Sequence, residues 1–332
     1  MSSQNQRVEF IQRALQTHQF SCEPITSDAS FRRYYRVAKG TEASWVLMES
    51  PVDKVDNTPF VALNSVFTQQ GLNLPSIIAQ DEQCGLVLLQ DLGSTHLADR
   101  LDTHARLHDY QALLDLLPNI AQTPTSEWMK PYDADFIAME LEIFHEWLVT
   151  KWLKSSLTEQ QQIQWQNVKS RLVAVMLEQP QVTMHRDFHS RNVIFHQLQW
   201  YLIDYQDAVQ GPVTYDSVSL LRDCYTRLPT DEFAMLQRYS FDKLHAAGLL
   251  ADMDFSRYQY YFDLTGLQRH LKAAGIFTRL LQRDGKGGYL DNILPTLDYI
   301  LEAAQKYDEF QWLASWIRHD IMPKAKVKLS AK

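Results

Sequence analysis

Three oxygen-bearing side chains stand close together in the middle of the chain: Asp187, Asn192 and Asp204. The first two belong to the stretch HRDFHSRNVIF, and the third follows in WYLIDYQ. Phosphoryl transfer needs few parts, because a carboxylate must orient the acceptor hydroxyl and Mg²⁺ must bridge the phosphates. Magnesium takes hard oxygen ligands, and one or two side chains suffice because water and phosphate complete the octahedron. The two stretches therefore supply the parts of a phosphoryl-transfer site.

The pattern is H-x-D-x-x-x-x-N followed by I-D, with the second Asp twelve residues after the Asn. This spacing matches the catalytic loop of protein kinases, and the second Asp falls where that family has its D-F-G Asp. Short apolar runs flank the polar residues and predict strands, so the second Asp should lie across a hairpin from the Asn. The alternative is a polar hairpin whose Asp and Asn only cap turns. His185 is expected to support the loop rather than to do chemistry.

The elements that must position these residues change in character along the chain. FRRYYRV ends at a Lys-Gly turn and predicts a strand, and ASWVLMES predicts the strand that returns from it. A helix should follow, with Thr58 as N-cap and Pro59 at its first position. GLVLLQDLG predicts one more buried strand, and residues 4–19 carry apolar side chains at helical spacing.

From residue 94 onward the pattern is mostly helical, with helices expected over 134–153, over 160–178 and through much of 213–320. Two short strands bracket the polar motif. The sequence therefore predicts an α+β fold with two lobes, residues 1–92 and 93–332. A small-molecule site is expected where such lobes meet.

The stretch HRDFHSRNVIF…WYLIDYQDAVQGPVTYDSVSLLRD resembles the aminoglycoside-phosphotransferase-like kinases, which have a protein-kinase-like bilobal fold. SDASFRRYYRV, ELEIFHEWLV and GLQRHLKAAGIFTRLLQRDGKGGYL are similar, within that superfamily, to the bacterial anomeric amino-sugar kinases. Those enzymes phosphorylate C1 of N-acetylmuramate and N-acetylglucosamine during cell-wall recycling. The resemblance implies an ATP- and Mg²⁺-dependent sugar kinase, with a small β-rich nucleotide-binding N-lobe and a larger helical C-lobe that carries the catalytic and metal loops.

Residue by residue, the resemblance implies that Asp187 accepts the proton of the acceptor hydroxyl, and that Asn192 and Asp204 hold magnesium. Asp216 would brace the catalytic loop from the helix that follows the metal loop. The end of VLLQDLG would be the hinge, where backbone groups meet the adenine ring: Gln90, Asp91 and Leu92.

Two further residues are assigned to substrate contact or support, Arg191 and Asp207. Asp207 is an extra metal or substrate contact in one interpretation and a turn cap in the other.

The sequence departs from the kinase pattern at the phosphates. The turn SDASFRRYY contains no glycine, and Ser27, Ser30 and backbone amides are expected to contact the phosphates instead. An ordinary hairpin turn is the alternative. The third strand has Met48 where kinases have a Lys, and the following helix has no acidic residue. Both members of the usual Lys–Glu pair are missing together, as expected because a lone buried charge costs several kcal/mol.

Another cation must then neutralise the phosphates. Strand alternation places Phe31, Arg33 and Tyr35 on the same inward face as Val37, with Arg32 on the other face. We expect Arg33 to make the phosphate contact, because arginine grips phosphate with two hydrogen bonds. The alternative is a surface arginine beside a strand.

The acceptor should approach from the helical lobe. Glu142 and Glu146 share one helix face and would either hydrogen-bond the sugar, brace the catalytic loop or remain solvated. Arg269, His270 and Lys272 are close in sequence, and a cation facing the cleft would suit the carboxylate of N-acetylmuramate. It would suit a polycationic aminoglycoside poorly. A solvated helix face is the alternative for this cluster.

The composition is that of a globular protein, with 332 residues, 45% of them hydrophobic, and a formal charge of −8. The negative charge argues against nucleic acid as a partner. No apolar run is long enough for a membrane span, the N-terminus lacks a signal-peptide pattern, and the three cysteines are scattered. We therefore expect a cytoplasmic monomer or weak dimer whose partners are a nucleotide and a small sugar, with no membrane partner.

Three rival interpretations remain open at this level. An antibiotic kinase is favoured by the negative charge, because its substrates are cations. A pseudokinase-type binding protein is favoured by the missing Lys and disfavoured by the complete Asp–Asn–Asp set. Protein-kinase activity is disfavoured, because the chain has no A-P-E segment and too few residues for an activation loop.

Overall fold

The computed structural model describes residues 3–25, 31–41 and 43–330. The chain divides into two compact units, each formed by two separate segments. The N-terminal unit comprises Met1–Asp99 and Arg191–Gln206, and the helical unit comprises Arg100–Ser190 and Asp207–Lys332. This division differs from the single boundary expected after residue 92, because a later hairpin returns to the N-terminal unit.

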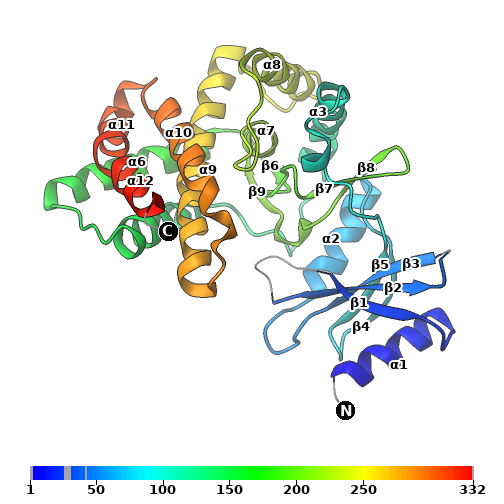
Figure 1. Cartoon of the computed structure of the whole chain (residues 1–332). Helices are drawn as coiled ribbons and strands as arrows, with labels where there is room; N and C mark the ends of the chain where they lie inside the picture. The colour runs from blue at the N-terminus through cyan, green and yellow to red at the C-terminus, as the bar shows by residue number, and fades with distance from the viewer. Residues whose placement is uncertain (1–2, 26–30, 42, 331–332) are drawn as a thin grey trace. The chain divides into compact units, whose positions relative to one another are not determined.

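The N-terminal unit is built on a five-stranded antiparallel sheet with the strand order β1–β2–β3–β5–β4 (Figure 1). The sheet strands and the two helices of this unit are α1 (Ser3–Leu15), β1 (Ser21–Ile25), β2 (Arg33–Lys39), β3 (Ala43–Glu49), α2 (Thr58–Gln69), β4 (Ile77–Asp81) and β5 (Leu86–Gln90). The hairpin predicted from FRRYYRV and ASWVLMES is confirmed as β2 and β3, and the predicted helix is confirmed as α2. Its N-cap is Asn57 rather than Thr58.

One face of this sheet packs against α1. Alternate residues of β2, β3 and β5 join Phe10 and Ile11 of α1 in one apolar cluster, which contains Val37, Leu47, Leu86 and Leu88. Because strand side chains alternate between faces, Tyr34 and its cross-strand partner Met48 lie on the face away from α1.

The returning hairpin consists of β7 (Val193–His196) and β8 (Gln199–Leu202). Its backbone bonds to the N-terminal unit, since Phe195 N donates to Thr95 O at 2.8 Å and Leu202 N to Asn73 O at 2.9 Å. The hairpin brings Asn192 and Asp204 to the same end, because they flank its two strands.

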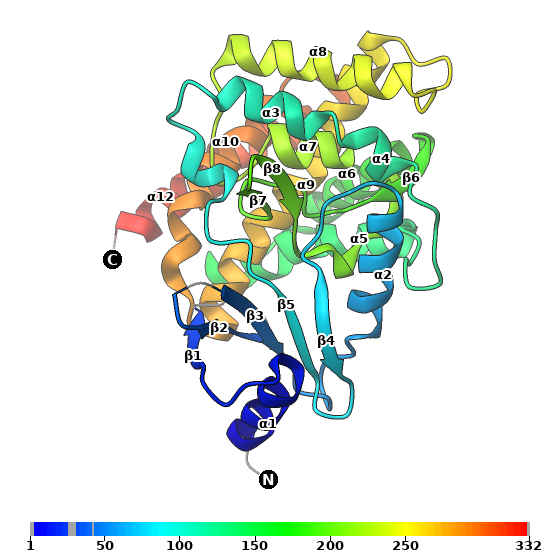
Figure 2. The ribbon, with the colours of Figure 1, turned by 90° about the vertical axis from the view of Figure 1, so that its right-hand side faces the viewer.

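The helical unit contains most of the helices and a further pair of strands, β6 (Gln181–Met184) and β9 (Val209–Pro212) (Figure 2). Its α-helices are α3 (Arg106–Leu114), α4 (Leu117–Ala121), α5 (Ala134–Ile143), α6 (Glu159–Glu178), α7 (Tyr215–Leu221), α8 (Thr230–Ala246), α9 (Phe255–Asp284), α10 (Ile293–Ala304), α11 (Gln311–Trp316) and α12 (Met322–Ser330). Strands β6 and β9 pair antiparallel. The predicted helix over 134–153 is present, but its second half, Phe144–Trp152, is π-helical.

Helix α9 is the centre of this unit and packs against α5, α6, α7 and α10. Eighteen of its thirty residues are buried. The junction between α5 and the π-helical segment approaches α9 at Gly275, where an added Cβ would lie 2.5 Å from the carbonyl oxygen of Ile143. Glycine is therefore required there by space, because backbone atoms cannot yield as a flexible side chain can. In the described part of the chain, no helix combines the length and apolarity that a membrane crossing needs.

Candidate active site

The loop that follows β6 is held at both ends by carboxylates. Asp216, buried on α7, accepts hydrogen bonds from the backbone N–H of His185 at 2.7 Å and of Arg186 at 2.9 Å. Asp223 is also buried and accepts a hydrogen bond from the backbone N–H of Ser190 at 2.9 Å. Arg186 has a φ of +75°, a strained conformation for a residue with a side chain. The two carboxylates hold this strained loop in place.

A buried charge network lies under the loop and centres on Glu140 of α5. Glu140 is only 1% exposed. Its Oε1 lies 2.7 Å from both Arg186 Nη2 and Lys272 Nζ. Its Oε2 accepts hydrogen bonds from Tyr132 and from Gln268 Nε2, the latter at 3.1 Å. Burial would raise the pKa of Glu140, but the two cations outweigh it and lower the pKa to about 2.

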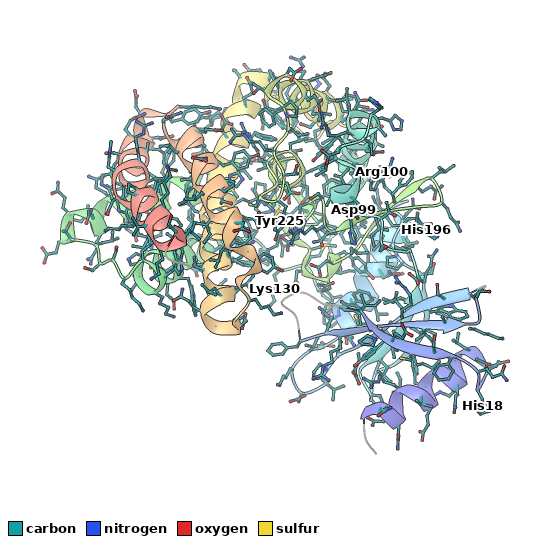
Figure 3. The ribbon with its side chains drawn as sticks, viewed as in Figure 1. His18, Asp99, Arg100, Lys130, His196 and Tyr225 are labelled. Carbon is teal, nitrogen blue, oxygen red and sulfur yellow. The ribbon has the colours of Figure 1, made fainter. Side chains whose placement is uncertain are left out.

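Asp187 lies within this loop and is partly exposed. Burial alone would raise the pKa of its carboxyl group. The positive charges of Lys272, Arg186 and Arg269, with His189, outweigh burial and hold the pKa well below its usual range. The His189 ring itself packs edge-on against Tyr225, labelled in Figure 3, at a centroid distance of 5.5 Å. Asp187 is therefore ionised at neutral pH and can accept a hydrogen bond or a proton.

Asp216 differs from Asp187 in this respect. Burial raises its pKa to about 7, and its two bonds to backbone N–H groups offset burial only in part. Asp187 thus keeps its charge at neutral pH, whereas Asp216, which holds the loop, has a pKa close to neutral pH.

Asn192 and Asp204 form the second group, and both belong to the N-terminal unit. Ile203 N donates to Asn192 O at 3.0 Å, which closes the hairpin and leaves Asn192 Nδ2 3.4 Å from Asp204 Oδ2. Gln206 Nε2 donates to Asp204 Oδ1 at 2.7 Å. Asp204 is exposed and has a φ of +62°. A carboxylate and an amide oxygen at adjacent positions fit the ligand preference of magnesium.

Helix α2 fixes the residue after Asp204. The Tyr205 ring stacks on Phe60 at a centroid distance of 4.9 Å, and its hydroxyl accepts a hydrogen bond from Asn64 Nδ2 at 2.7 Å. Tyr205 is fully buried, so the packing of one side chain determines where the neighbouring exposed carboxylate stands.

The face of the sheet away from α1 carries Tyr34. Burial raises the pKa of the Tyr34 hydroxyl to about 12, with Arg32 acting against the rise and Asp204 adding to it. Both charged groups therefore lie within electrostatic range of this hydroxyl. Arg32 is half-buried, whereas Arg33 is exposed. Arg33 faces the α1 side of the sheet and lies opposite Glu49 in the register of β2 and β3.

The expected inward position of Arg33 is thus wrong. Strand parity was correct, since Arg33 shares a face with Tyr35 and Val37, but α1 packs on that face. Phe31 is 63% exposed, which also contradicts its expected inward position. Ser27 and Ser30 lie outside the described residues.

The predicted hinge follows β5. Gln90 N donates to Ser76 O at 2.9 Å, so this backbone donor is already engaged. The carboxylate of Asp91 pairs with Arg36 at 2.8 Å, and the buried Leu92 presents its carbonyl oxygen 3.1 Å from Nδ1 of His196, labelled in Figure 3. The predicted hinge is therefore held by contacts to other residues of the N-terminal unit.

Two residues expected near the acceptor lie elsewhere. Glu142 bonds to His145 at 2.7 Å and to Lys169 of α6 at 2.8 Å, so it ties two helices together and does not brace the loop. His270 is buried, stacks on Tyr299 and lies 2.8 Å from Arg222 O.

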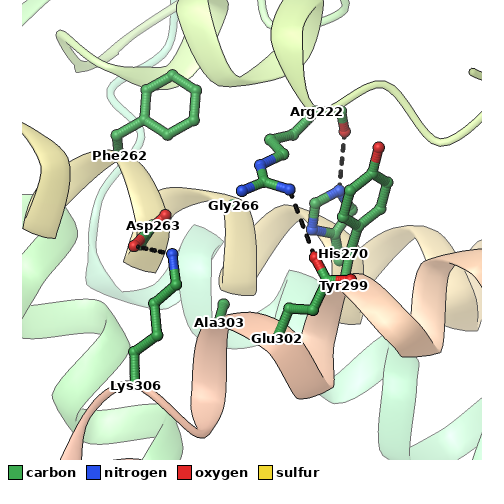
Figure 4. A pocket seen from close by; sticks show the side chains of 9 residues that line it. All are labelled: Arg222, Phe262, Asp263, Gly266, His270, Tyr299, Glu302, Ala303 and Lys306. Carbon is green, nitrogen blue, oxygen red and sulfur yellow. Dashed lines mark hydrogen bonds and ion pairs between the residues drawn. The ribbon is translucent and has the colours of Figure 1, made fainter. Parts of the chain in front are cut away.

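His270 lines a small pocket (Figure 4). Two ion pairs also line this pocket, one between Asp263 and Lys306 and one between Arg222 and Glu302. Burial lowers the pKa of His270 to about 3, so it is a neutral packing residue. Arg191 and Asp207 are exposed.

Sequence reasoning missed Glu140, Tyr132 and Gln268. The sequence does carry a signal for Glu140, because it lies on the apolar stripe of its helix, three residues after Ile137 and one before Leu141. An acidic side chain at such a position costs free energy unless it is paired.

Comparison with known proteins agrees with this geometry. Residues 21–250 match the model of the phosphotransferase enzyme family. The chain belongs to this family. The phosphotransferase is 34% identical over 315 residues to the N-acetylmuramate/N-acetylglucosamine kinase of Neisseria meningitidis, with 93% of each chain covered. It is also 34% identical to the enzyme of the same name from Pseudomonas putida, with 90% of this chain and 87% of that one covered.

Solved structures show the same fold. The phosphotransferase matches choline kinase LicA from Streptococcus pneumoniae with a TM-score of 0.63, at 11% identity and with 90% and 99% of the chains covered. An ADP-bound aminoglycoside phosphotransferase matches with a TM-score of 0.60, at 12% identity and with 89% and 97% covered. The predicted protein-kinase-like α+β fold is confirmed. The protein is an enzyme that transfers a phosphoryl group to a hydroxyl, and its family and fold support a nucleotide donor.

Proposed function

We propose that this phosphotransferase uses ATP to phosphorylate the anomeric C1 hydroxyl of N-acetylmuramate and N-acetylglucosamine. The observation that carries the proposal is the loop around Asp187, where a carboxylate kept ionised by buried cations stands at the position that the kinase motif assigns to it. Two relatives that match over most of their length are named for these two sugars.

The chain's own residues account for the steps on the acceptor side. Asp187 orients the acceptor hydroxyl through a hydrogen bond and takes its proton as the oxygen bonds to the γ-phosphorus. The bond from the γ-phosphorus to the β–γ bridging oxygen breaks in the same step, and ADP leaves. Because its pKa is held low, it is a weak base, and orientation is its larger contribution in a loose transition state. Asp216 and Asp223 keep the loop in place. Asn192 and Asp204 would hold Mg²⁺, which would supply positive charge to the phosphates.

Arg32 takes the place of the missing kinase lysine in this proposal. It precedes β2, and alternation directs it to the same face as Tyr34. It acts electrostatically on the Tyr34 hydroxyl, as Asp204 does. Arg32→Ala should raise the KM for ATP about 10-fold, the loss of one charge-assisted hydrogen bond. The matched control is Arg33→Ala, which should leave KM within about 2-fold. The same KM in both variants would contradict this assignment.

The buried cations near Asp187 also bear on the rival substrate class. Arg186 and Lys272 pair with Glu140, so Arg269 is the cation near the loop that forms no ion pair among the described residues, and its charge disfavours a polycationic aminoglycoside. Cytoplasmic location and a monomeric or weakly dimeric state stay predictions.

The test follows ADP release from ATP and Mg²⁺ with N-acetylmuramate, N-acetylglucosamine or kanamycin, using Asp187→Asn as control. We expect turnover on both N-acetyl sugars, loss of turnover in the variant, and an acid-labile product whose ³¹P–¹H coupling identifies the anomeric position. Turnover on kanamycin alone, or a phosphate at another hydroxyl, would contradict the proposal.

A further inference from the structure

Arg269 of α9 is a buried arginine with no counter-ion in contact. The residue is 8% exposed, and its guanidinium carbon lies 5.3 Å from the centroid of the Tyr215 ring. Among the residues that the structure describes, Arg269 forms no hydrogen bond or ion pair, and its Nε is buried without a partner. The two other cations near Asp187, the half-buried Arg186 of the loop and the buried Lys272, both pair with Glu140 at 2.7 Å.

Arg269 therefore carries a positive charge that forms no ion pair in the described part of the chain. An arginine offers five N–H donors in a fixed plane, and it keeps its charge even when buried. Burial works against the charge of Arg269, but acidic groups nearby, Asp187 and Asp223 among them, keep its pKa raised. Stacking on an aromatic ring covers a face of the guanidinium and leaves its edge, which carries the N–H groups, available to a ligand. A buried, pre-oriented donor edge is therefore suited to a planar anion.

The position beside Asp187 indicates which substrate would bring that anion. Asp187 receives the acceptor hydroxyl in the proposed function, and Arg269 is close enough to act on its charge. N-acetylmuramate and N-acetylglucosamine differ by one group, the lactyl ether, which ends in a carboxylate. A carboxylate has the planar geometry that a guanidinium binds with two parallel hydrogen bonds.

We propose that Arg269 binds the lactyl carboxylate of N-acetylmuramate and is the residue that sets the preference between the two sugars. This inference rests on the proposed function. It assigns to Arg269 a role in specificity, whereas Lys272 and Arg186, which both pair with Glu140, hold the loop.

The first experiment compares kcat/KM for both sugars in the wild type and in Arg269→Gln. We expect a loss of about 30- to 100-fold for N-acetylmuramate, the range for hydrogen bonds to a charged group. For N-acetylglucosamine we expect a change below about 3-fold, because Lys272 and Arg186 lower the pKa of Asp187 more than Arg269 does and remain in the variant. Turnover of N-acetylglucosamine in the same preparation shows that the variant is folded. An equal loss for both sugars would overturn the inference, because Arg269 would then act on a shared group such as the transferred phosphate.

Arg279→Gln is the matched control on the same helix. Arg279 is half-buried, and its Nε is likewise buried without a partner in the described part of the chain. It lies ten residues from Arg269, about 15 Å along a helix. The ratio of kcat/KM for the two sugars should stay within about 2-fold of wild type. A collapse of this ratio in Arg279→Gln, with Arg269→Gln unchanged, would overturn the assignment.

A second experiment leaves the protein intact, and so decides the question even if Arg269→Gln fails to fold. The wild type is given the methyl ester of N-acetylmuramate, which keeps the lactyl group but lacks its charge. We expect kcat/KM for the ester to fall to the level of N-acetylglucosamine or below. Equal kcat/KM for ester and acid would overturn the inference while the sugar kinase assignment stands, whereas no turnover of either parent sugar would refute the proposed function itself.

Discussion

The proposed catalytic loop around Asp187 and the proposed metal pair, Asn192 and Asp204, follow each other in the sequence, yet the protein holds them differently. Asp187 sits in a loop braced by two buried carboxylates above the Glu140 ion network. Asp204 is exposed, and its position derives from the packing of Tyr205 on α2. The first region is pre-organised by buried charges, which position a reacting group without reorganisation. The second is more exposed, which suits the proposed binding of Mg²⁺ together with its nucleotide. Substitutions around the Asp187 loop should therefore affect both stability and catalysis, whereas substitutions at Asn192 and Asp204 should affect catalysis alone.

The sharpest break is expected at Asp187 itself. Asp187→Asn keeps the shape of the side chain but removes the charge that orients the hydroxyl and accepts its proton, so turnover should fall about 10³-fold. Single-turnover ADP release measures this. The control, Asp135→Asn, makes the same change at an exposed position of α5 and should be neutral. Activity retained in Asp187→Asn would contradict its assigned role.

Removing Glu140 should show that the catalytic region is structural as well. Glu140→Ala leaves two buried cations unpaired, and we expect the free energy of unfolding to fall by about 3 kcal/mol. Urea unfolding measures it against Glu142→Ala, whose ion pairs are half-exposed and should contribute less than about 1 kcal/mol. Similar losses for both would show that the buried network is not what holds this region.

The metal pair should respond in the opposite way. Asp204→Asn tolerates the same left-handed backbone, because Asn adopts it readily, but supplies a weaker ligand. We expect the Mg²⁺ concentration for half-maximal activity to rise about 10- to 100-fold, with the free energy of unfolding within about 0.5 kcal/mol of wild type. A marked loss of stability, or an unchanged Mg²⁺ titration, would undo the contrast between the regions.

Helix α9 carries Lys272 and Arg269 to the loop, and its position depends on Gly275. Gly275→Ala forces a Cβ against the backbone of Ile143 and should destabilise the protein by about 2 kcal/mol. Gly266→Ala on the same helix meets its nearest neighbour at 3.6 Å, and should be neutral or slightly stabilising because alanine favours helix. Thermal unfolding of the two variants tests this, and equal melting temperatures would contradict the close approach.

The smallest effect concerns pH. The pKa of Glu140 is lowered to about 2 in the folded protein, from 4.5, so the unfolded chain binds more protons between these values. The stability that Glu140 contributes is present above about pH 5 and is lost as pH falls toward 2. The difference in unfolding free energy between wild type and Glu140→Gln should shrink by about 1 kcal/mol between pH 6 and pH 3.5. A difference that does not vary with pH would show that the Glu140 charge is not stabilising.

The candidate catalytic motif could be recognised in the sequence because it is local. Asp187 and Asn192 lie on one loop, and Asp204 lies one hairpin further, so spacing along the chain was enough to bring them into consideration. Hairpin β2–β3, helix α2 and the long helices also followed from alternation and helical periodicity. Side-chain partners across large sequence separations did not, because periodicity tells which face a residue occupies but not what covers that face.

Arg32 and Arg33 show this limit most clearly. Alternation by itself determined that the two arginines point to opposite faces of the sheet, and the sequence alone determined that no lysine stands on the third strand. Only the tertiary structure decided that α1 covers the Arg33 face, because that depends on how distant apolar residues pack. It likewise decided that Glu140 rather than Glu142 meets the loop around Asp187, since Glu140 contacts Arg186 of that loop and two of its other partners come from α9, more than 120 residues further along the chain.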